Sequence, residues 1–110
     1  MTSFSAFWPF YCREHSQPLT RQLHLIGSIL GPLAAVAVFL GTGSAHALWL
    51  WAAFGYGFAW VGHFFVEKNR PATFRYPFYS LAGDYVMVWK MLTGKMDGEV
   101  AKALQEPRTV

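Results

Sequence analysis

The segment that decides the fold is 22–66, which reads QLHLIGSILGPLAAVAVFLGTGSAHALWLWAAFGYGFAWVGHFFV. It contains no Asp, Glu, Lys or Arg, so all 9 basic and all 6 acidic residues of the 110-residue chain lie outside it. Two apolar runs flank the short polar link at 42–46, and each is close to the roughly 20 residues that an α-helix needs to cross a hydrocarbon core. The sequence therefore predicts an all-α membrane protein with a two-span transmembrane helical hairpin, its spans at 19–41 and 47–67.

The composition is that of one small membrane domain, 1–110. Hydrophobic residues make up 54% of the chain and aromatic residues 18%, which is more than a soluble core of this size absorbs. The net charge is +3, but Lys and Arg form no dense stripe, so we expect membrane lipid and no nucleic acid as a partner. The basic residues bracket the spans and avoid the link, and the positive-inside rule then places both termini in the cytoplasm. Ala45-His46-Ala47 imitates a signal-peptidase site, but the apolar run before it is too long for a secretory signal.

Amphipathic helices are predicted before and after the hairpin. The segment 3–15 carries aromatic residues at helical spacing, which predicts an interfacial helix with its rings in lipid. These residues are Phe4, Phe7, Trp8 and Tyr11. A second interfacial helix is predicted at 80–93, followed by a frayed tail at 95–110. The lone Cys12 has no partner for a disulfide or a metal, so we expect it to be an inert residue of an apolar face.

Small residues on the first span predict a close helix contact. Gly27-x-x-x-Gly31 lets another backbone approach, because glycine has no side chain to hold it away. Two partners fit this seam: the second span of the same hairpin, or a second copy of the protein.

Three of the four histidines and one glutamate are predicted to meet at the cytoplasmic membrane boundary. In an antiparallel hairpin the start of the first span and the end of the second lie at the same face, so His24 and His63 share one level. Glu67 follows His63 by one helical turn. The helix break before Pro18 can fold His15 back toward His24.

This donor set indicates a metal site. A single histidine at a bilayer edge is usually only an interfacial polar residue, but several ionisable residues in one place favour a function. Imidazole nitrogen with carboxylate oxygen is the ligand set of non-haem iron and of zinc, and it leaves positions open for substrate or O₂. The fourth histidine, His46, lies at the opposite face and is assigned to the turn.

Three motifs surround these histidines. They are Tyr11-x-x-x-His15, His24-Leu-Ile-Gly27 and Gly62-His63-x-x-x-Glu67-Lys-x-Arg70-Pro71-Ala72. Together they resemble the motifs of the Mpo-type 2-hydroxy fatty acid dioxygenase family. The short bacterial branch is the most similar, because it shares Phe-Trp-Pro-Phe-Tyr near the start, Tyr-Gly-Phe-Ala-Trp before His63 and Glu-Lys-Asn-Arg-Pro-Ala-Thr-Phe after it. The resemblance covers roughly residues 4–95.

The resemblance implies Fe(II)-dependent α-oxidation, in which a 2-hydroxy fatty acid and O₂ give the acid one carbon shorter, CO₂ and water. By the family pattern the iron ligands would be His15, His24 and His63, and Glu67 would be a fourth ligand or would fix an imidazole tautomer. Two further residues are candidates for catalysis beside Glu67. Arg70 would receive the substrate carboxylate at headgroup level, and Tyr11 would be an acid–base group; lipid-phosphate contact and a membrane-belt ring are their simpler roles.

The resemblance also bears on location and assembly. It implies an integral protein of the bacterial inner membrane. The donor set itself leaves zinc as a possible substitute for Fe(II). The long eukaryotic members carry extra apolar segments between the two histidine-bearing motifs, whereas this chain has one hairpin. We therefore expect a homodimer or larger homo-oligomer in which a second copy supplies a wall of the metal site. The alternative is a non-catalytic lipid-binding or assembly protein with a structural metal or none.

Overall fold

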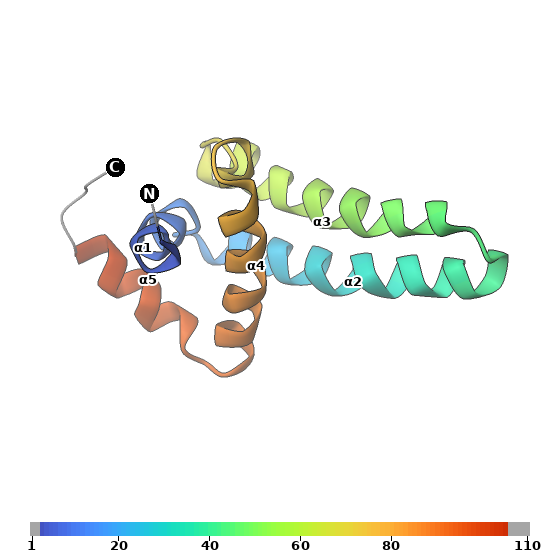
Figure 1. Cartoon of the computed structure of the whole chain (residues 1–110). Helices are drawn as coiled ribbons and strands as arrows, with labels where there is room; N and C mark the ends of the chain where they lie inside the picture. Colours follow the sequence, from blue (N-terminus) through green and yellow to red (C-terminus); the bar gives the residue numbers. More distant parts are fainter. Residues whose placement is uncertain (1–2, 106–110) are drawn as a thin grey trace.

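The computed structural model describes residues 3–105, and every regular element within them is helical (Figure 1). The α-helices are α1 (Phe4–Glu14), α2 (Pro18–Thr42), α3 (Trp49–Val61), α4 (Pro77–Leu92) and α5 (Met96–Gln105). The connections contain the 3₁₀ turn η1 (Ala45–Leu48), the π-helical segment η2 (Gly62–Glu67) and the 3₁₀ turn η3 (Ala72–Phe74). The predicted all-α class is confirmed.

The hairpin of α2 and α3 projects away from the other helices, and its two helices run side by side (Figure 1). Glycines on α2 let the two backbones touch. A Cβ added at Gly27 would lie 2.8 Å from the carbonyl oxygen of Phe54, and one at Gly31 would lie 2.8 Å from that of Trp51. Gly27 and Gly31 therefore form the close contact between α2 and α3 of the same hairpin. The alternative in which Gly27 and Gly31 meet a second copy is wrong, because α3 already covers that face.

One described helix, α2, is long and apolar enough to cross a membrane by length and composition. Its 25 residues match the first predicted span. The second predicted span, 47–67, is helical but is not a single α-helix of membrane length, because α3 has only 13 residues. The 3₁₀ turn η1 precedes α3, and the wider π-helical η2 follows it. The structure thus shows no second helix of membrane length within the described residues.

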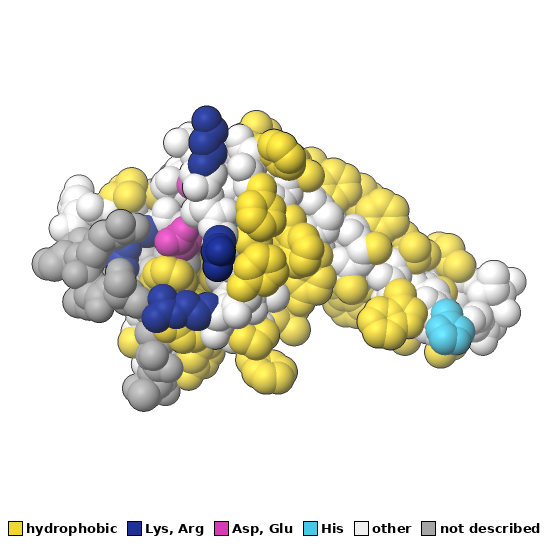
Figure 2. All heavy atoms as spheres, turned by 90° about the horizontal axis from the view of Figure 1, so that it is seen from above, with side chains coloured by type: hydrophobic (Ala, Val, Ile, Leu, Met, Phe, Trp, Pro, Cys, Tyr) yellow, Lys and Arg dark blue, Asp and Glu magenta, His cyan; other side chains and the backbone are white. Residues whose placement is uncertain are grey.

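The surface of the hairpin is apolar. In Figure 2 hydrophobic side chains predominate among the coloured side chains of the projecting part, which has a histidine near its tip, whereas Lys, Arg, Asp and Glu gather at the other end of the molecule. Many large side chains of α2 and α3 are exposed, among them Ile26, Ile29, Leu33, Val36, Leu40, Trp49 and Val61. A contiguous apolar surface of this kind marks contact with a membrane or with another protein.

The helix α1 packs against α4 and α5 and forms the core of the globular end. Phe7, Tyr11 and Cys12 are 0% exposed, in a cluster with Met87 of α4 and Met96 of α5. The prediction that the aromatic face of 3–15 lies in lipid is therefore wrong for its central rings, since α4 and α5 cover them. The buried free thiol of Cys12 agrees with the inert role predicted for it.

The helix α5 was not expected. The sequence predicts a frayed tail over 95–110, whereas Met96–Gln105 is helical; the last residues of that predicted tail lie outside the described part. The buried face of α5 has the i, i+4, i+7 spacing of an amphipathic helix and consists of Met96, Val100 and Ala103. Glu99 fastens the helix, because its carboxylate accepts hydrogen bonds from Trp8 Nε1 at 3.1 Å and from Lys90 Nζ at 2.8 Å.

The helix α4 crosses the base of the hairpin (Figure 1). It begins three residues before the predicted helix at 80–93 and ends one residue before the predicted end. One of its faces packs on the core through Gly83 and Met87, and another carries exposed apolar side chains. The exposed ones include Phe78, Leu81, Trp89 and Leu92. The amphipathic character predicted for this segment is thus present.

Candidate metal centre

Three histidines from three elements meet where the base of the hairpin packs against α1. His15 is the residue that caps the C-terminus of α1, His24 lies in α2, and His63 lies in η2. Their exposed fractions are 1%, 3% and 2%. One ligand nitrogen from each ring lies within 4.8 Å of the others, and the ring planes cross at 80°, 82° and 86°. The predicted convergence of these three side chains is confirmed.

The turn between α1 and α2 folds His15 back toward the hairpin. Pro18 begins α2, where its missing N–H and fixed φ cost nothing. The guanidinium of Arg21 holds the end of α1 by donating to the carbonyl oxygens of His15 at 2.8 Å and Ser16 at 3.0 Å. The ring of His15 stacks on the ring of Tyr11, with centroids 3.9 Å apart, and its Nδ1 donates to the Tyr11 carbonyl oxygen at 2.6 Å.

A close approach between α2 and η2 brings the other two rings together. A Cβ at Gly62 would lie 2.9 Å from Thr20 Cγ2, so glycine is what allows this contact. One turn further along α2, His24 Nδ1 donates to the carbonyl oxygen of Thr20 at 3.0 Å. Next to Gly62, His63 Nδ1 donates to the side-chain oxygen of Asn69 at 2.7 Å.

The chain reversal after η2 positions Asn69. Lys68 has φ 61°, the left-handed conformation that ends the helix, and the backbone N–H of Asn69 then donates to the His63 carbonyl oxygen at 2.9 Å. The side-chain amide of Asn69 donates to the Glu14 carbonyl oxygen at 3.1 Å and to the Glu14 carboxylate. Because its NH₂ is committed to Glu14, its oxygen faces His63.

All three imidazoles are therefore held in the same tautomer. Each Nδ1–H donates to an oxygen that can only accept, so each neutral ring keeps a free lone pair on Nε2. The Nε2 atoms of His15 and His24 face each other at 3.1 Å, with neither able to donate. Burial, aided by the two neighbouring rings, holds the pKa of His15 well below its usual value. Converging lone pairs on neutral buried rings repel one another unless a cation lies between them, so the donor set fits a metal ion.

A carboxylate borders the cluster. Asp84 of α4 has its Oδ1 3.7 Å from His24 Nε2 and accepts a hydrogen bond of 2.5 Å from the Tyr11 hydroxyl. Burial raises the pKa of Asp84 to about 7, although the hydrogen bond from Tyr11 opposes the shift. Burial also raises the pKa of Tyr11, and the nearby Asp84 adds to this. Gly83 allows the approach, since a Cβ there would lie 2.9 Å from the Tyr11 ring.

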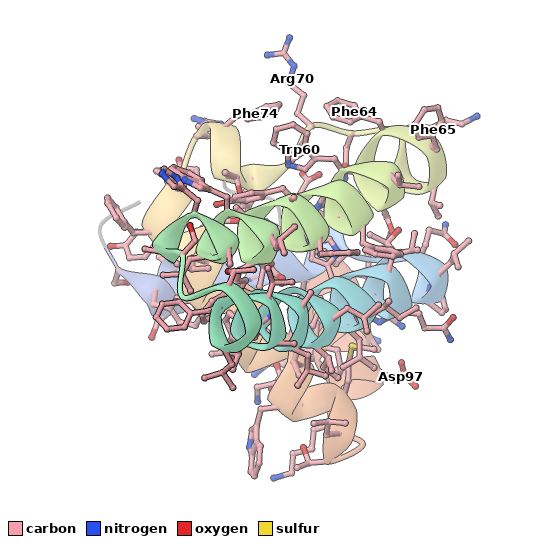
Figure 3. All side chains as sticks on the ribbon, turned by 90° about the vertical axis from the view of Figure 1, so that its right-hand side faces the viewer. Trp60, Phe64, Phe65, Arg70, Phe74 and Asp97 are labelled. Atoms are coloured by element: carbon pink, nitrogen blue, oxygen red, sulfur yellow. The ribbon has the colours of Figure 1, made fainter. Side chains whose placement is uncertain are left out.

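The other predicted site residues lie elsewhere. Glu67 is outside the three-histidine group: its carboxylate accepts from Ser16 Oγ at 3.0 Å and from the Gln17 N–H at 2.6 Å, at the N-terminus of α2. The i, i+4 alignment with His63 assumes an α-helix, whereas η2 is a π-helix with more residues per turn. Arg70 is exposed and projects away from the helices (Figure 3). His46 is exposed in η1, within the connection between α2 and α3.

A known protein family matches most of this chain. The model of a family described as 2-hydroxy-palmitic acid dioxygenase Mpo1-like matches residues 1–96. This chain belongs to the Mpo1-like family. No curated protein and no solved structure matches it. The match includes all three clustered histidines, as well as Asp84 and Asn69.

Two residues of this Mpo1-like site were missed by sequence reasoning. Asn69 stands inside the motif after Glu67, but its backward bond depends on the left-handed turn at Lys68. The helical periodicity of 80–93 places Asp84 opposite the apolar residues and so predicts a solvated side chain, whereas the structure puts it beside His24. The one available signal was an acidic residue directly after a glycine in an otherwise apolar stretch.

We expect Asn69→Ala to weaken metal binding by about 10–100-fold, the usual cost of losing the partner that orients a ligating imidazole. The variant removes the acceptor of His63 Nδ1–H, so this ring can rotate or change tautomer. Competition with a chelator of known affinity measures the change. Arg70→Ala, one position further and exposed, is the matched control and should bind as the unmodified chain does. Equal affinity in both variants would show that Asn69 does not position the ligand.

Proposed function

We propose that this protein is an Fe(II)-dependent dioxygenase of the membrane that shortens 2-hydroxy fatty acids by one carbon. The observation that carries the proposal is the convergence of three buried imidazoles whose tautomers leave every Nε2 free. The family to which the chain belongs supports the substrate class. Zinc fits the same nitrogen donors but has no redox chemistry, so iron is the metal that suits an oxygenase.

The proposed reaction balances without another co-reactant. The 2-hydroxy acid loses four electrons as its C1–C2 bond breaks, O₂ gains them, and the products are the shorter acid, CO₂ and water. Bound iron would supply the one-electron chemistry that O₂ requires, and an α-hydroxycarboxylate suits it because two of its oxygens can chelate one metal. Three protein ligands leave positions open for this.

The chain's own residues have distinct proposed roles. His15, His24 and His63 would hold the iron, with their orientation set by Tyr11, Thr20 and Asn69. The carboxylate of Asp84, 3.7 Å from His24 Nε2, accepts a hydrogen bond from the substrate hydroxyl, and the Tyr11 hydroxyl keeps it in place.

Two predicted roles are revised within the proposal. Glu67 acts as a positioning residue, because its carboxylate joins the end of η2 to the N-terminus of α2 and sits where a helix favours negative charge. Arg70 contacts lipid headgroups, since its side chain is exposed and projects away from the helices (Figure 3).

The membrane placement follows from the apolar hairpin. We propose that α2 and the stretch from η1 to η2 insert together, and that α4 lies in the interface with its exposed apolar face toward the lipid. The metal centre then sits near the cytoplasmic boundary, where a fatty acid can enter from the bilayer. All three candidate ligands belong to one chain. We therefore propose that metal binding does not require the second copy that the sequence leads us to expect.

This placement predicts the topology. A reporter fused after Val110 should be active only on the cytoplasmic side, and a cysteine placed in the link at Gly43 should react with an impermeant reagent added from outside. The reason is that basic residues flank the hairpin at both ends while the link has no charge. A terminus and a link on the same side would contradict insertion of the hairpin.

Oxygen uptake tests the function itself. Iron-loaded protein in detergent should consume O₂ with a 2-hydroxy fatty acid but not with the same acid lacking the hydroxyl, because only the former chelates through C1 and C2 oxygens. Absence of uptake with every hydroxy acid, when iron is bound at one per chain, would favour the non-catalytic lipid-binding alternative.

A further inference from the structure

A cavity of about 470 Å³ lies between the hairpin and α4, beside the metal centre. Its volume is within the range of ligand pockets. His24 and Asp84 line it, and so do residues of α3 and η1 that are not part of the histidine cluster. The cavity therefore connects the metal centre with the membrane-facing part of the hairpin.

The polarity of the lining is uneven. Among the described residues around the cavity, one imidazole and one carboxylate are present, those of His24 and Asp84. Away from them the walls are mainly aliphatic and aromatic, and include Leu48, Trp49 and Leu81. The indole N–H of Trp51 donates to the hydroxyl of Tyr85 at 2.8 Å; both residues line the cavity, and their bond ties α3 to α4. This distribution of polar and apolar lining residues suits a ligand with a polar head and an apolar chain.

Small residues make room along η1 and α3. Ala45, Ala52 and Gly55 all line the cavity, and a Cβ added at Gly55 would meet no atom within 4 Å. The distance from Gly55 back to Ala45 corresponds to about 15 Å of helix. With single bonds of about 1.5 Å in a zigzag, this length accommodates an acyl chain of roughly a dozen carbons.

We propose that this cavity binds the acyl chain of the substrate and that Ala52 and Gly55 determine the chain length that is accepted. The carboxyl and hydroxyl end lies at His24 and Asp84, and the methyl end points along α3 toward Ala45. The inference rests on the proposed function for the identity of the polar head. Gly55 is near the head and Ala52 is one turn further along, so a bulky side chain should exclude more of the chain at Gly55 than at Ala52.

The test is a graded pair of variants with neighbouring controls. Gly55→Leu and Ala52→Leu fill the cavity, whereas Gly57→Leu and Ala53→Leu add the same side chain to exposed positions of the same helix that do not line it. The readout is kcat/KM for 2-hydroxy acids of increasing length, with bound iron measured in every variant. Each methylene kept out of the cavity should cost about fourfold. Ala52→Leu should therefore shorten the preferred chain, Gly55→Leu should shorten it further, and the controls should keep the original profile. An unchanged profile in all four iron-loaded variants would overturn the proposal while leaving the function intact.

A second readout does not require turnover. A 2-hydroxy fatty acid with a photoreactive diazirine near its methyl end is crosslinked to the protein and the labelled residues are located by mass spectrometry. Labelling should concentrate on residues 45–52, fall at least tenfold in Gly55→Leu and remain in Gly57→Leu. Even labelling of the outer faces of α2 and α3, equal in both variants, would show that the chain lies in detergent or lipid instead. The labelling pattern can be read even if no hydroxy acid is turned over. The acyl-chain proposal and the proposed function can therefore fail separately.

Discussion

His24→Ala is expected to lower metal affinity by more than about 100-fold, because even the outer partners of a ligating imidazole contribute 10–100-fold. His15→Ala and His63→Ala should do the same, since each removes one of the three imidazole donors that the described cluster contains. Metal analysis of protein purified in the presence of iron measures the loss. Far-UV circular dichroism on the same samples separates loss of a ligand from loss of the fold.

His46→Ala is the matched control for these variants. It removes an imidazole from the exposed end of the hairpin and should leave metal content unchanged. Retention of metal in all four variants would end the metal-centre hypothesis. Loss in His46→Ala alone would move the site to the other membrane face.

Gly31→Ile is expected to open the hairpin. Its Cβ would lie 2.8 Å from the backbone oxygen of Trp51, and a backbone atom cannot move aside as the end of a side chain can. Overpacking of this kind costs typically about 1–3 kcal/mol or more. Because the same helix pair sets the level of His24 and His63, we expect a lower unfolding temperature in detergent together with weaker metal retention.

Gly57→Ile places the same β-branched residue on α3, where an added Cβ meets no atom within 4 Å. This control makes the same change from glycine to a β-branched residue, and so the same change in helix propensity, without the steric conflict. Similar unfolding temperatures for the two variants would mean that the contact at Gly31 does not hold α2 and α3 together.

The hairpin and the histidine cluster could be predicted from the sequence because the physics behind them is local. A charge-free apolar stretch with a polar link has few alternatives to two packed helices. An antiparallel pair then brings the start of one helix level with the end of the other, so His24 and His63 meet. The break before Pro18 adds His15 by the same short-range reasoning.

Long-range packing explains what could not be predicted. The aromatic face of α1 has the same residue pattern whether it packs against lipid or against the apolar face of α5. Its burial within the protein depends on Met96 and its neighbours, in a segment whose two glycines do not favour a helix. The sequence pattern alone predicts a solvated Asp84. In the structure Gly83 lets α4 approach Tyr11 closely, and Asp84 then accepts a hydrogen bond from the Tyr11 hydroxyl. The displacement of Glu67 depends on a π-helical turn, for which the sequence carries no recognised signal.

The most direct test of the central claim, that the three histidines form the metal centre of a 2-hydroxy fatty acid dioxygenase, is product analysis. Iron-loaded protein is incubated with 2-hydroxypalmitic acid in air, and the acids and CO₂ are quantified by mass spectrometry. The account predicts equal amounts of the fifteen-carbon acid and CO₂, formed by the unmodified chain and by His46→Ala but not by His24→Ala. Unchanged 2-hydroxypalmitic acid, in a sample that holds one iron per chain, would contradict it.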